Sequence, residues 1–291
     1  MTSISAAVPT GPGAESDAEL AVRAALAGAV VVREMYGTAL RRVDKSGGDF
    51  ATSADLAAER AILDVLRAAR PDDAVTGEEG GATGAAGARR RWLVDPLCGT
   101  LNYAVRNMLV AVNVALRADG ATTAAASADP FNDEVFWTDG VRARVRRDGV
   151  DEELSPSPSS ALVDVNLDPP FPHAPEFRAV DLLAAPGFAA RFRPRVVSST
   201  LAVAWVAAGR RAAYVTDGGT GLRDSVHFAA GIALCEAAGC VVTGIDGGPV
   251  HTGAGGLIAA ADRETHAALL ALAGKATPDA RPAEDPASSV R

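Results

Sequence analysis

The stretch that decides the fold is Trp92–Tyr103, with the sequence WLVDPLCGTLNY. Its first half is apolar and reaches Asp95, which is typical of a buried strand that delivers a carboxylate at its end. Proline and glycine follow at once and end the strand in a turn. Cys98 stands inside that turn, where a thiol can act as a nucleophile or as a ligand for a soft metal ion. The stretch therefore predicts a strand that ends in a reactive loop.

Two helices are predicted before this strand. Ser16 followed by Glu19 forms a capping-box pattern that opens an apolar-periodic run to about Tyr36. Ser53 opens a second such run, which stops before Pro71. Both runs indicate helices that pack one face against a core.

The rest of the chain divides into two patterns. Short apolar runs bounded by turn residues predict strands at Arg91–Asp95, Leu109–Leu116, Thr122–Ala128 and Glu134–Trp137. After the polar linker, elements alternate as strand, helix, strand and helix at Arg195–Val197, Thr200–Ala208, Ala212–Thr216 and Val226–Ala238. The sequence thus predicts an N-terminal α+β lobe over residues 16–155, a C-terminal α/β lobe over 156–274, and disordered tails over 1–15 and 275–291.

Composition narrows the class of protein. The chain has 291 residues, 48% of them hydrophobic, which is enough to bury a large core. Its net charge of −8 comes from both signs scattered along the chain, without the basic stripe that binding to nucleic acid or anionic membranes requires. No run approaches the ~20 apolar residues that span a bilayer. With 3 cysteines and no framework spacing, a reduced cytoplasmic protein without nucleic-acid or membrane partners is expected.

Three motifs in chain order carry a family resemblance. They are Gly77-Glu78-Glu79, Asp95-Pro96-Leu97-Cys98-Gly99-Thr100 and Val226-His227-Phe228-Ala229-Ala230-Gly231. With these motifs, the chain from about Asp17 to Gly274 resembles the inositol monophosphatase superfamily, whose signatures are GEE, DPxDGT and WDxAAG. The resemblance implies the layered αβαβα sandwich of that family, which combines α+β and α/β parts, and it also suggests a homodimer.

The chain departs from the family at two metal ligands. The resemblance implies that Glu78, Asp95 and two further aspartates would hold magnesium ions, since hard cations prefer oxygen ligands. Here Cys98 replaces the second aspartate of DPxDGT, and His227 replaces the aspartate of WDxAAG. A thiol and a neutral imidazole are poor magnesium ligands. The main expectation is therefore a site without a metal cofactor, and magnesium or zinc is the alternative.

The two exchanges fall at positions that share one ion in the family, so the resemblance places Cys98 beside His227. An imidazole next to a thiol can accept its proton, so Cys98 is the predicted nucleophile and His227 its base. A carboxylate is needed to orient the imidazole. The candidates are Asp95 and, as the backup, Asp224, and the sequence does not choose between them.

The remaining site candidates follow from the same resemblance. In the family, the amides of Gly99 and Thr100 bind phosphate oxygens at a helix start, so here they are expected to form an oxyanion hole. Trp205 is a candidate for the substrate pocket, although core packing is the more common role of such a residue. Glu78 is a candidate orienting or structural residue.

This cysteine–histidine–aspartate site resembles that of the Dieckmann cyclases of tetramic acid and pyridone antibiotic pathways. The resemblance implies a cyclase that takes a β-ketoacyl-aminoacyl chain from the carrier-protein domain of a polyketide or peptide synthetase, holds it on Cys98 and closes the ring. Two alternatives stay open. One is a metal-dependent phosphatase of inositol or sugar phosphates that keeps one metal site, made by Glu78, Asp95 and the Leu97 carbonyl, and loses or changes the other. In a variant of this alternative, Asp95, Cys98 and His227 form a zinc-type set. The other is a non-catalytic phosphatase homologue.

Overall fold

The structure, a computed structural model, describes residues 15–45, 50–85, 87–167, 179–217, 219, 221–250 and 255–276. Two long helices lie at its N-terminal end: α1 (Asp17–Met35) and α2 (Ser53–Ala69), with the short strands β1 (Arg42–Asp44) and β2 (Phe50–Thr52) between them. The larger part of the predicted tails, residues 1–14 and 277–291, lies outside the described residues.

Within the described ranges, eight strands form the larger sheet, in the order β10-β9-β8-β7-β6-β5-β3-β4. They are β3 (Ala74–Gly77), β4 (Gly81–Thr83), β5 (Arg90–Cys98), β6 (Ala111–Ala118), β7 (Ala121–Asp129), β8 (Glu134–Thr138), β9 (Ala143–Arg147) and β10 (Val150–Glu153). All pairs except β3 with β5 are antiparallel. A sheet of this kind can be built from short loops along the chain.

The smaller sheet has five strands among the described residues, in the order β12-β11-β13-β15-β14. They are β11 (Leu162–Asn166), β12 (Arg193–Val196), β13 (Ala213–Thr216), β14 (Val241–Thr243) and β15 (Leu257–Ala260). The remaining helices are α3 (Thr100–Ala104), α4 (Ala179–Ala184), α5 (Phe188–Arg191), α6 (Leu201–Ala207), the 3-10 helix η2 (Leu222–Asp224), α7 (Ala229–Ala238) and α8 (Arg263–Ala276).

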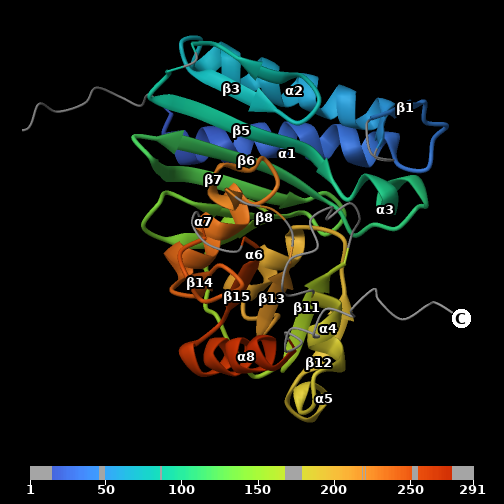
Figure 1. The fold of residues 1–291 in the computed structure, drawn as a ribbon. Coiled ribbons are helices and arrows are strands. Elements are labelled where there is room, and N and C mark those ends of the chain that lie inside the picture. Colours follow the sequence, from blue (N-terminus) through green and yellow to red (C-terminus); the bar gives the residue numbers. More distant parts are fainter. Residues whose placement is uncertain are drawn as a thin grey trace, which may run out of the picture.

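These elements stack in five layers (Figure 1). Helices α1 and α2 cover one face of the larger sheet and share a hydrophobic core with it. Helices α6 and α7 lie between the two sheets, and α4, α5 and α8 cover the outer face of the smaller sheet. The predicted layered αβαβα sandwich is confirmed.

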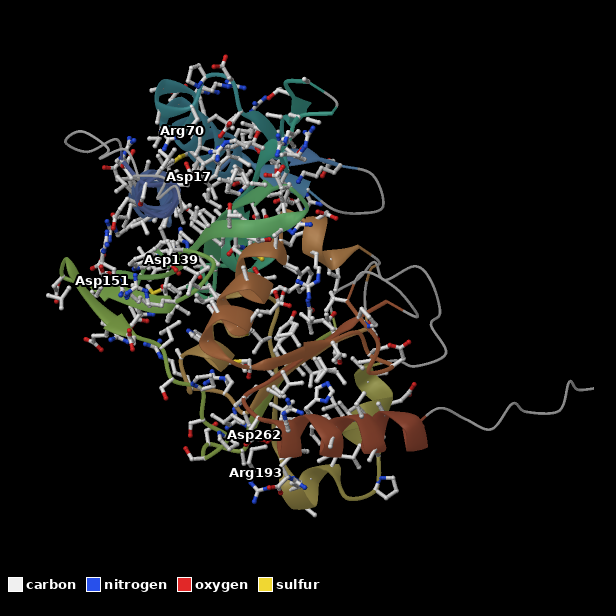
Figure 2. The ribbon with its side chains drawn as sticks, turned by 90° about the vertical axis from the view of Figure 1, so that its left-hand side faces the viewer. Asp17, Arg70, Asp139, Asp151, Arg193 and Asp262 are labelled. Carbon is white, nitrogen blue, oxygen red and sulfur yellow. The ribbon has the colours of Figure 1, made fainter. Side chains whose placement is uncertain are left out.

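Local chemistry explains the first layer. Ser16 accepts a hydrogen bond from the amide of Glu19 at 3.1 Å and caps α1 as predicted. The two helices pack closely because α1 has a glycine at the contact, where a Cβ on Gly28 would lie 2.7 Å from the Cδ1 of Ile62. At the far end, Arg70 reaches from the end of α2 to Asp17 at the start of α1 (Figure 2), with a hydrogen bond of 3.1 Å.

Candidate metal and phosphate site

A bulge at the end of β5 brings Asp95 and Cys98 to the same side of the sheet. Asp95 pairs with Asn113 of β6 and Cys98 pairs with Ala111, so β5 has one more residue than β6 in this interval. An extra residue of this kind re-aims the side chains that follow it. Leu97 packs into the core under α1 and α2, whereas Cys98 packs toward α6 and α7. The predicted loop is therefore a bulge with its thiol turned toward the middle layer.

Gly99 lets the chain turn sharply after this bulge. Its φ is +108°, and a Cβ there would lie 3.0 Å from the carbonyl oxygen of Leu109 and 3.1 Å from that of Ser198. Asn102 donates hydrogen bonds to the same two carbonyls, at 2.9 and 2.8 Å. The loop after Cys98 is thus fastened to the segment that leads into α6.

His227 meets Asp95 from the opposite layer. It lies in the turn before α7, and its Nδ1–H donates to Oδ2 of Asp95 at 2.8 Å. The Asp95 side chain is fully buried, while that of His227 is 42% exposed. The imidazole is therefore oriented from within the protein and open to a ligand from outside.

The sulfur of Cys98 lies at the same place and accepts two hydrogen bonds from Thr200. The amide N–H of Thr200 donates at 3.3 Å and its hydroxyl at 3.0 Å. The amide of Asn113 in turn donates to the Thr200 hydroxyl at 2.9 Å. Ligand atoms of Asp95, Cys98 and His227 all lie within 4.8 Å of one another. We call these three residues the cysteine cluster.

The sequence analysis did not assign a role to Thr200. A threonine just before an apolar helical run indicates an N-cap. Thr200 does precede α6, but its side chain makes no capping hydrogen bond and serves the sulfur instead. It stands 102 residues after Cys98 in the chain, so no local pattern could join the two.

A second group of charges lies beside this one. The ammonium of Lys45 contacts Oε1 of Glu78 at 2.9 Å and Oε1 of Glu79 at 2.6 Å. The side chains are 25%, 16% and 5% exposed respectively. We call these residues the lysine cluster. Glu78 therefore pairs with Lys45. The carboxylate that forms a hydrogen bond with His227 is Asp95, not Glu78.

Asp55 and Thr100 connect the site to α2. One carboxylate oxygen of Asp55 accepts from Thr52 and completes the capping box of α2. The other accepts from the hydroxyl of Thr100 at 2.9 Å. Thr100 opens α3, so the start of this short helix is held by the cap of a longer one.

The charges of the cysteine cluster shift its pKa values. Burial lowers the pKa of His227, but the Asp95 carboxylate and the hydrogen bonds of Asp95 and Cys98 outweigh it, and the pKa stands well above its usual value. Burial and the charge of Asp95 raise the pKa of the Cys98 thiol, against the opposing effects of His227 and Thr200. Burial, together with Asp95, raises the pKa of Glu78 to about 8.

Two other candidates lie elsewhere. Asp224, the backup partner of His227, instead accepts from Arg117 at 2.8 Å, with a side chain that is 68% exposed. Trp205 packs in the core of the middle layer, and the guanidinium of Arg211 lies 4.5 Å from its ring centre. Its buried Nε1 has no hydrogen-bond partner among the described residues. Neither residue joins the cysteine cluster, so the orienting carboxylate is Asp95.

The layered αβαβα fold, with Asp95 and Cys98 at the end of β5 and His227 before α7, is the arrangement expected from the family resemblance. The model of the inositol monophosphatase family matches residues 14–277. The Nus factor SuhB of Salmonella typhimurium is 33% identical over 257 residues, which are 86% of this chain and 93% of that protein. The chain belongs to the inositol monophosphatase family, which is a family of enzymes.

Two further relatives agree with this assignment. The inositol-1-monophosphatase of Caulobacter vibrioides is 28% identical over 240 residues, 80% of this chain and 90% of that protein. The crystal structure of the extragenic suppressor protein suhB from Bartonella henselae has a TM-score of 0.76 at 26% identity, and the match covers 90% of this chain and 98% of that one.

These findings correct the functional expectation. The predicted Dieckmann cyclase of antibiotic biosynthesis is wrong, because the relatives are named SuhB and inositol-1-monophosphatase. Burial and the charge of Asp95 also raise the pKa of the Cys98 thiol, whereas an activated cysteine has a lowered pKa. The sequence prediction took proximity to an imidazole as activation of the thiol, and the burial of Cys98 was not visible in the sequence.

Two dependent expectations are wrong for the same reason. A site without a metal cofactor conflicts with membership of a family whose enzymes are magnesium-dependent. A synthetase carrier-protein domain as partner conflicts with relatives that are named Nus factor SuhB and inositol-1-monophosphatase. As for the membrane, none of the described helices has the length and apolar character needed to cross one.

Proposed function

We propose that the protein is a divalent-metal-dependent phosphatase of small phosphate monoesters, of the inositol or sugar phosphate type, with an altered metal centre. The observation that carries this proposal is the cysteine cluster, in which an oxygen, a sulfur and a nitrogen ligand atom lie within 4.8 Å of one another. The cluster stands where the family resemblance places a metal, and the 42% exposure of His227 leaves it open to a substrate.

The donor set decides which ion fits. Magnesium requires near-octahedral oxygen ligands. Here Glu78 and Glu79 are held by Lys45, and the Leu97 carbonyl accepts from Thr100 at 3.2 Å. An ion in an all-oxygen site made by Glu78, Asp95 and the Leu97 carbonyl would therefore compete with Lys45 for Glu78.

Zinc fits the cysteine cluster better. It is bound by thiolate, imidazole and carboxylate groups, and catalytic zinc sites have three protein ligands and one open position. Asp95, Cys98 and His227 offer one ligand atom each, which makes three. A zinc-type ion would supply Lewis-acid polarisation of a phosphoryl oxygen at this place.

Residues around the cluster have definable tasks in this proposal. Asp95 fixes the ring of His227, and Thr200 fixes the sulfur of Cys98, so both ligands are held before an ion binds. The first amides of α3, those of Gly99 and Thr100, lack intrahelical acceptors and are the proposed contacts for phosphate oxygens. The role predicted for them as an oxyanion hole thus becomes a phosphate-binding role.

The proposal is tested by metal analysis of the purified full-length protein, combined with phosphate release from inositol monophosphate. We expect one zinc per chain after zinc reconstitution, turnover that EDTA abolishes, and loss of both in Cys98→Ala. Cys240→Ala is the matched control, because Cys240 is also a half-buried free cysteine but is not a member of the cluster.

Two results would overturn the proposal. One is a reconstituted protein that contains no zinc at all. The other is a Cys98→Ala variant that keeps zinc and turnover at the level of Cys240→Ala. Zinc binding without turnover of any phosphate monoester would support the metal site but contradict the proposed phosphatase activity.

A further inference from the structure

A pocket outside the cysteine cluster is lined by three arginines. It has a volume of about 340 Å³, and its walls include Arg89, Arg91 and Arg117 together with the hydroxyl-bearing Thr76 and the apolar Leu93. Small-ligand pockets start at about 300 Å³, so this pocket has room for one compact group. Three guanidinium groups around one small volume indicate an anionic occupant.

The charge of the pocket is only partly neutralised by the protein. Arg91 donates to the hydroxyl of Thr76 at 3.2 Å and to the carbonyl of Ala85 at 3.2 Å. Among the described residues, these two neutral acceptors are its side-chain partners, and it has no ion pair with a carboxylate. Its positive charge is therefore available to a ligand.

The other two arginines are paired with carboxylates that are themselves largely exposed. Arg117 is 16% exposed, but its partner Asp224 is 68% exposed. Arg89 and Asp119 are 83% and 64% exposed. The Arg89–Asp119 pair is exposed on both sides and weak, and the exposed carboxylate of Asp224 can give way to an anion that binds Arg117. The pocket thus presents a net positive charge to a ligand that enters it.

The pocket and the cysteine cluster lie along one strand. Arg91, Leu93 and Asp95 alternate on β5, so their side chains share a face of the sheet, and Leu93 packs against α7 on that face. At ~3.3 Å per residue, the four steps from Arg91 to Asp95 span about 13 Å between Cα atoms. Asp224, at the pocket wall, precedes His227 in the segment leading to α7. The two places are therefore separated by about the length of a small extended ligand, which would pass beside the Asp224–His227 segment because Leu93 is buried under α7.

We propose that this arginine pocket binds a second anionic group, a phosphate or a carboxylate, of a substrate whose phosphate monoester lies at the cysteine cluster. The substrate class is then a doubly anionic phosphate monoester rather than a simple monophosphate. This reading of the substrate rests on the proposed phosphatase function, whereas the anion binding itself does not.

The pocket is tested first by direct binding. Full-length protein freed of metal with EDTA is titrated with inorganic pyrophosphate in a calorimeter. We expect binding by the wild type and about tenfold weaker binding by Arg91→Gln and by Arg117→Gln, since each removes a charge-assisted hydrogen-bond donor. The matched control is Arg195→Gln, an exposed arginine on β12 far from the pocket, which should bind as the wild type does.

Folding is controlled separately. Arg91→Lys keeps the charge without the forked donor and should bind pyrophosphate more tightly than Arg91→Gln. Urea unfolding of each variant shows that the chain is still folded. The proposed anion binding would be wrong if the wild type did not bind pyrophosphate. It would also be wrong if the wild type, Arg91→Gln and Arg117→Gln bound pyrophosphate equally.

The substrate class is tested by turnover. With the zinc-loaded enzyme, Arg91→Gln should raise the KM of a sugar bisphosphate about tenfold and leave the KM of the matching monophosphate unchanged. Equal effects on both substrates would contradict a second-anion site. If no variant hydrolyses either compound, the proposed function fails, while the pyrophosphate titration still decides the pocket.

Discussion

The lysine cluster and the cysteine cluster lie side by side at the end of β5 and solve the same electrostatic problem differently. In the first, the ammonium of Lys45 contacts Glu78 and Glu79 and opposes the burial and the Asp95 charge that raise the pKa of Glu78. In the second, Asp95 is compensated by the imidazole of His227, with the sulfur of Cys98 beside it. A lysine cannot leave its cluster, whereas an imidazole and a thiol can exchange their protons for a metal ion.

The difference between the two clusters indicates where an ion could bind in a family member whose metal ligands have changed. A carboxylate that already forms an ion pair with a lysine side chain gains little free energy by binding a metal cation. A set of sulfur, nitrogen and oxygen donors has room for an ion, but for one softer than magnesium. The four predictions below break or sharpen this contrast.

Converting the cysteine cluster back to oxygen ligands has the largest expected effect. In the double variant Cys98→Asp with His227→Asp, all three donors become carboxylates, which favour hard cations. We expect zinc affinity to fall by more than about 100-fold, because even outer partners of a ligand are worth 10–100-fold. Magnesium-dependent phosphate release from inositol monophosphate should rise. Metal competition and phosphate assays measure both, with Cys240→Asp as the control; unchanged zinc affinity would contradict the ligand assignment.

Removing the support of the sulfur has a smaller effect on the same cluster. Thr200→Val deletes the hydroxyl that donates to Cys98 at 3.0 Å and leaves the amide donor in place. Loss of such an outer partner should weaken zinc about 10–100-fold, as measured by competition with a chelator. Thr200→Ser keeps the hydroxyl and should bind zinc as the wild type does. If valine and serine give the same affinity, Thr200 is a packing residue only.

Breaking the lysine cluster tests the other side of the contrast. Lys45→Gln leaves Glu78 and Glu79, with side chains 16% and 5% exposed, without their cation. We expect the free energy of unfolding to fall by about 2–3 kcal/mol in urea titrations. Magnesium should restore part of it in the variant, because an ion that binds only the folded state stabilises that state.

The control for this experiment is Arg89→Gln. Its ion pair with Asp119 is 83% and 64% exposed, so the loss should be at most about 1 kcal/mol. Equal losses in the two variants would mean that the lysine cluster is an ordinary surface pair. Stabilisation of the wild type and of Lys45→Gln by the same amount of magnesium would show that Lys45 does not exclude the ion.

The sequence predicted one cluster well and the other poorly. Cys98, His227 and Asp95 were expected together because they replace or keep ligands of one ion in a family pattern, and the structure brings them within reach. Their chemistry was not predictable, since the raised pKa of Cys98 depends on burial and on the charge of Asp95. Lys45 had no predicted role, because its contact with Glu78 joins two segments that are distant in the chain and no local pattern shows it.

The fold shows the same limit. Helix α1 was predicted from its cap, and α2 was predicted from its apolar run starting at Ser53, although its cap is Thr52. The long strands of the larger sheet were predicted from their apolar runs. Strands β10 and β14 were missed, since each is short and its residues are exposed or half-buried. The bulge in β5 was also missed, because a two-residue periodicity cannot show where one strand gains a residue over its neighbour.

A carboxylate held by resident cations far from the site gives a reference for the lysine cluster. Glu134, 8% exposed, accepts from Arg147 and from Arg210, the latter at 2.7 Å. Burial alone would raise the pKa of Glu134, but the two guanidinium groups outweigh it and hold the pKa below its usual value. Its ionised form therefore stabilises the folded chain.

The smallest expected effect follows from that sign. A carboxyl group whose pKa is lowered in the folded chain stabilises that chain fully at pH values above its pKa in the unfolded chain, about 4.3 for Glu. This stabilisation is lost as the pH falls through the pKa of the folded chain. Glu134→Gln should lower the free energy of unfolding by about 1 kcal/mol at pH 7 and differ less from the wild type at pH 3, in urea titrations at both pH values. Glu264→Gln is the control. Glu264 pairs with Arg191 and is 84% exposed, so its removal should change the free energy of unfolding little at either pH. If Glu134→Gln has the same effect at both pH values, the charge of Glu134 does not stabilise the folded chain, and its contacts with Arg147 and Arg210 act through packing alone. The same conclusion would then extend to the carboxylates beside Lys45.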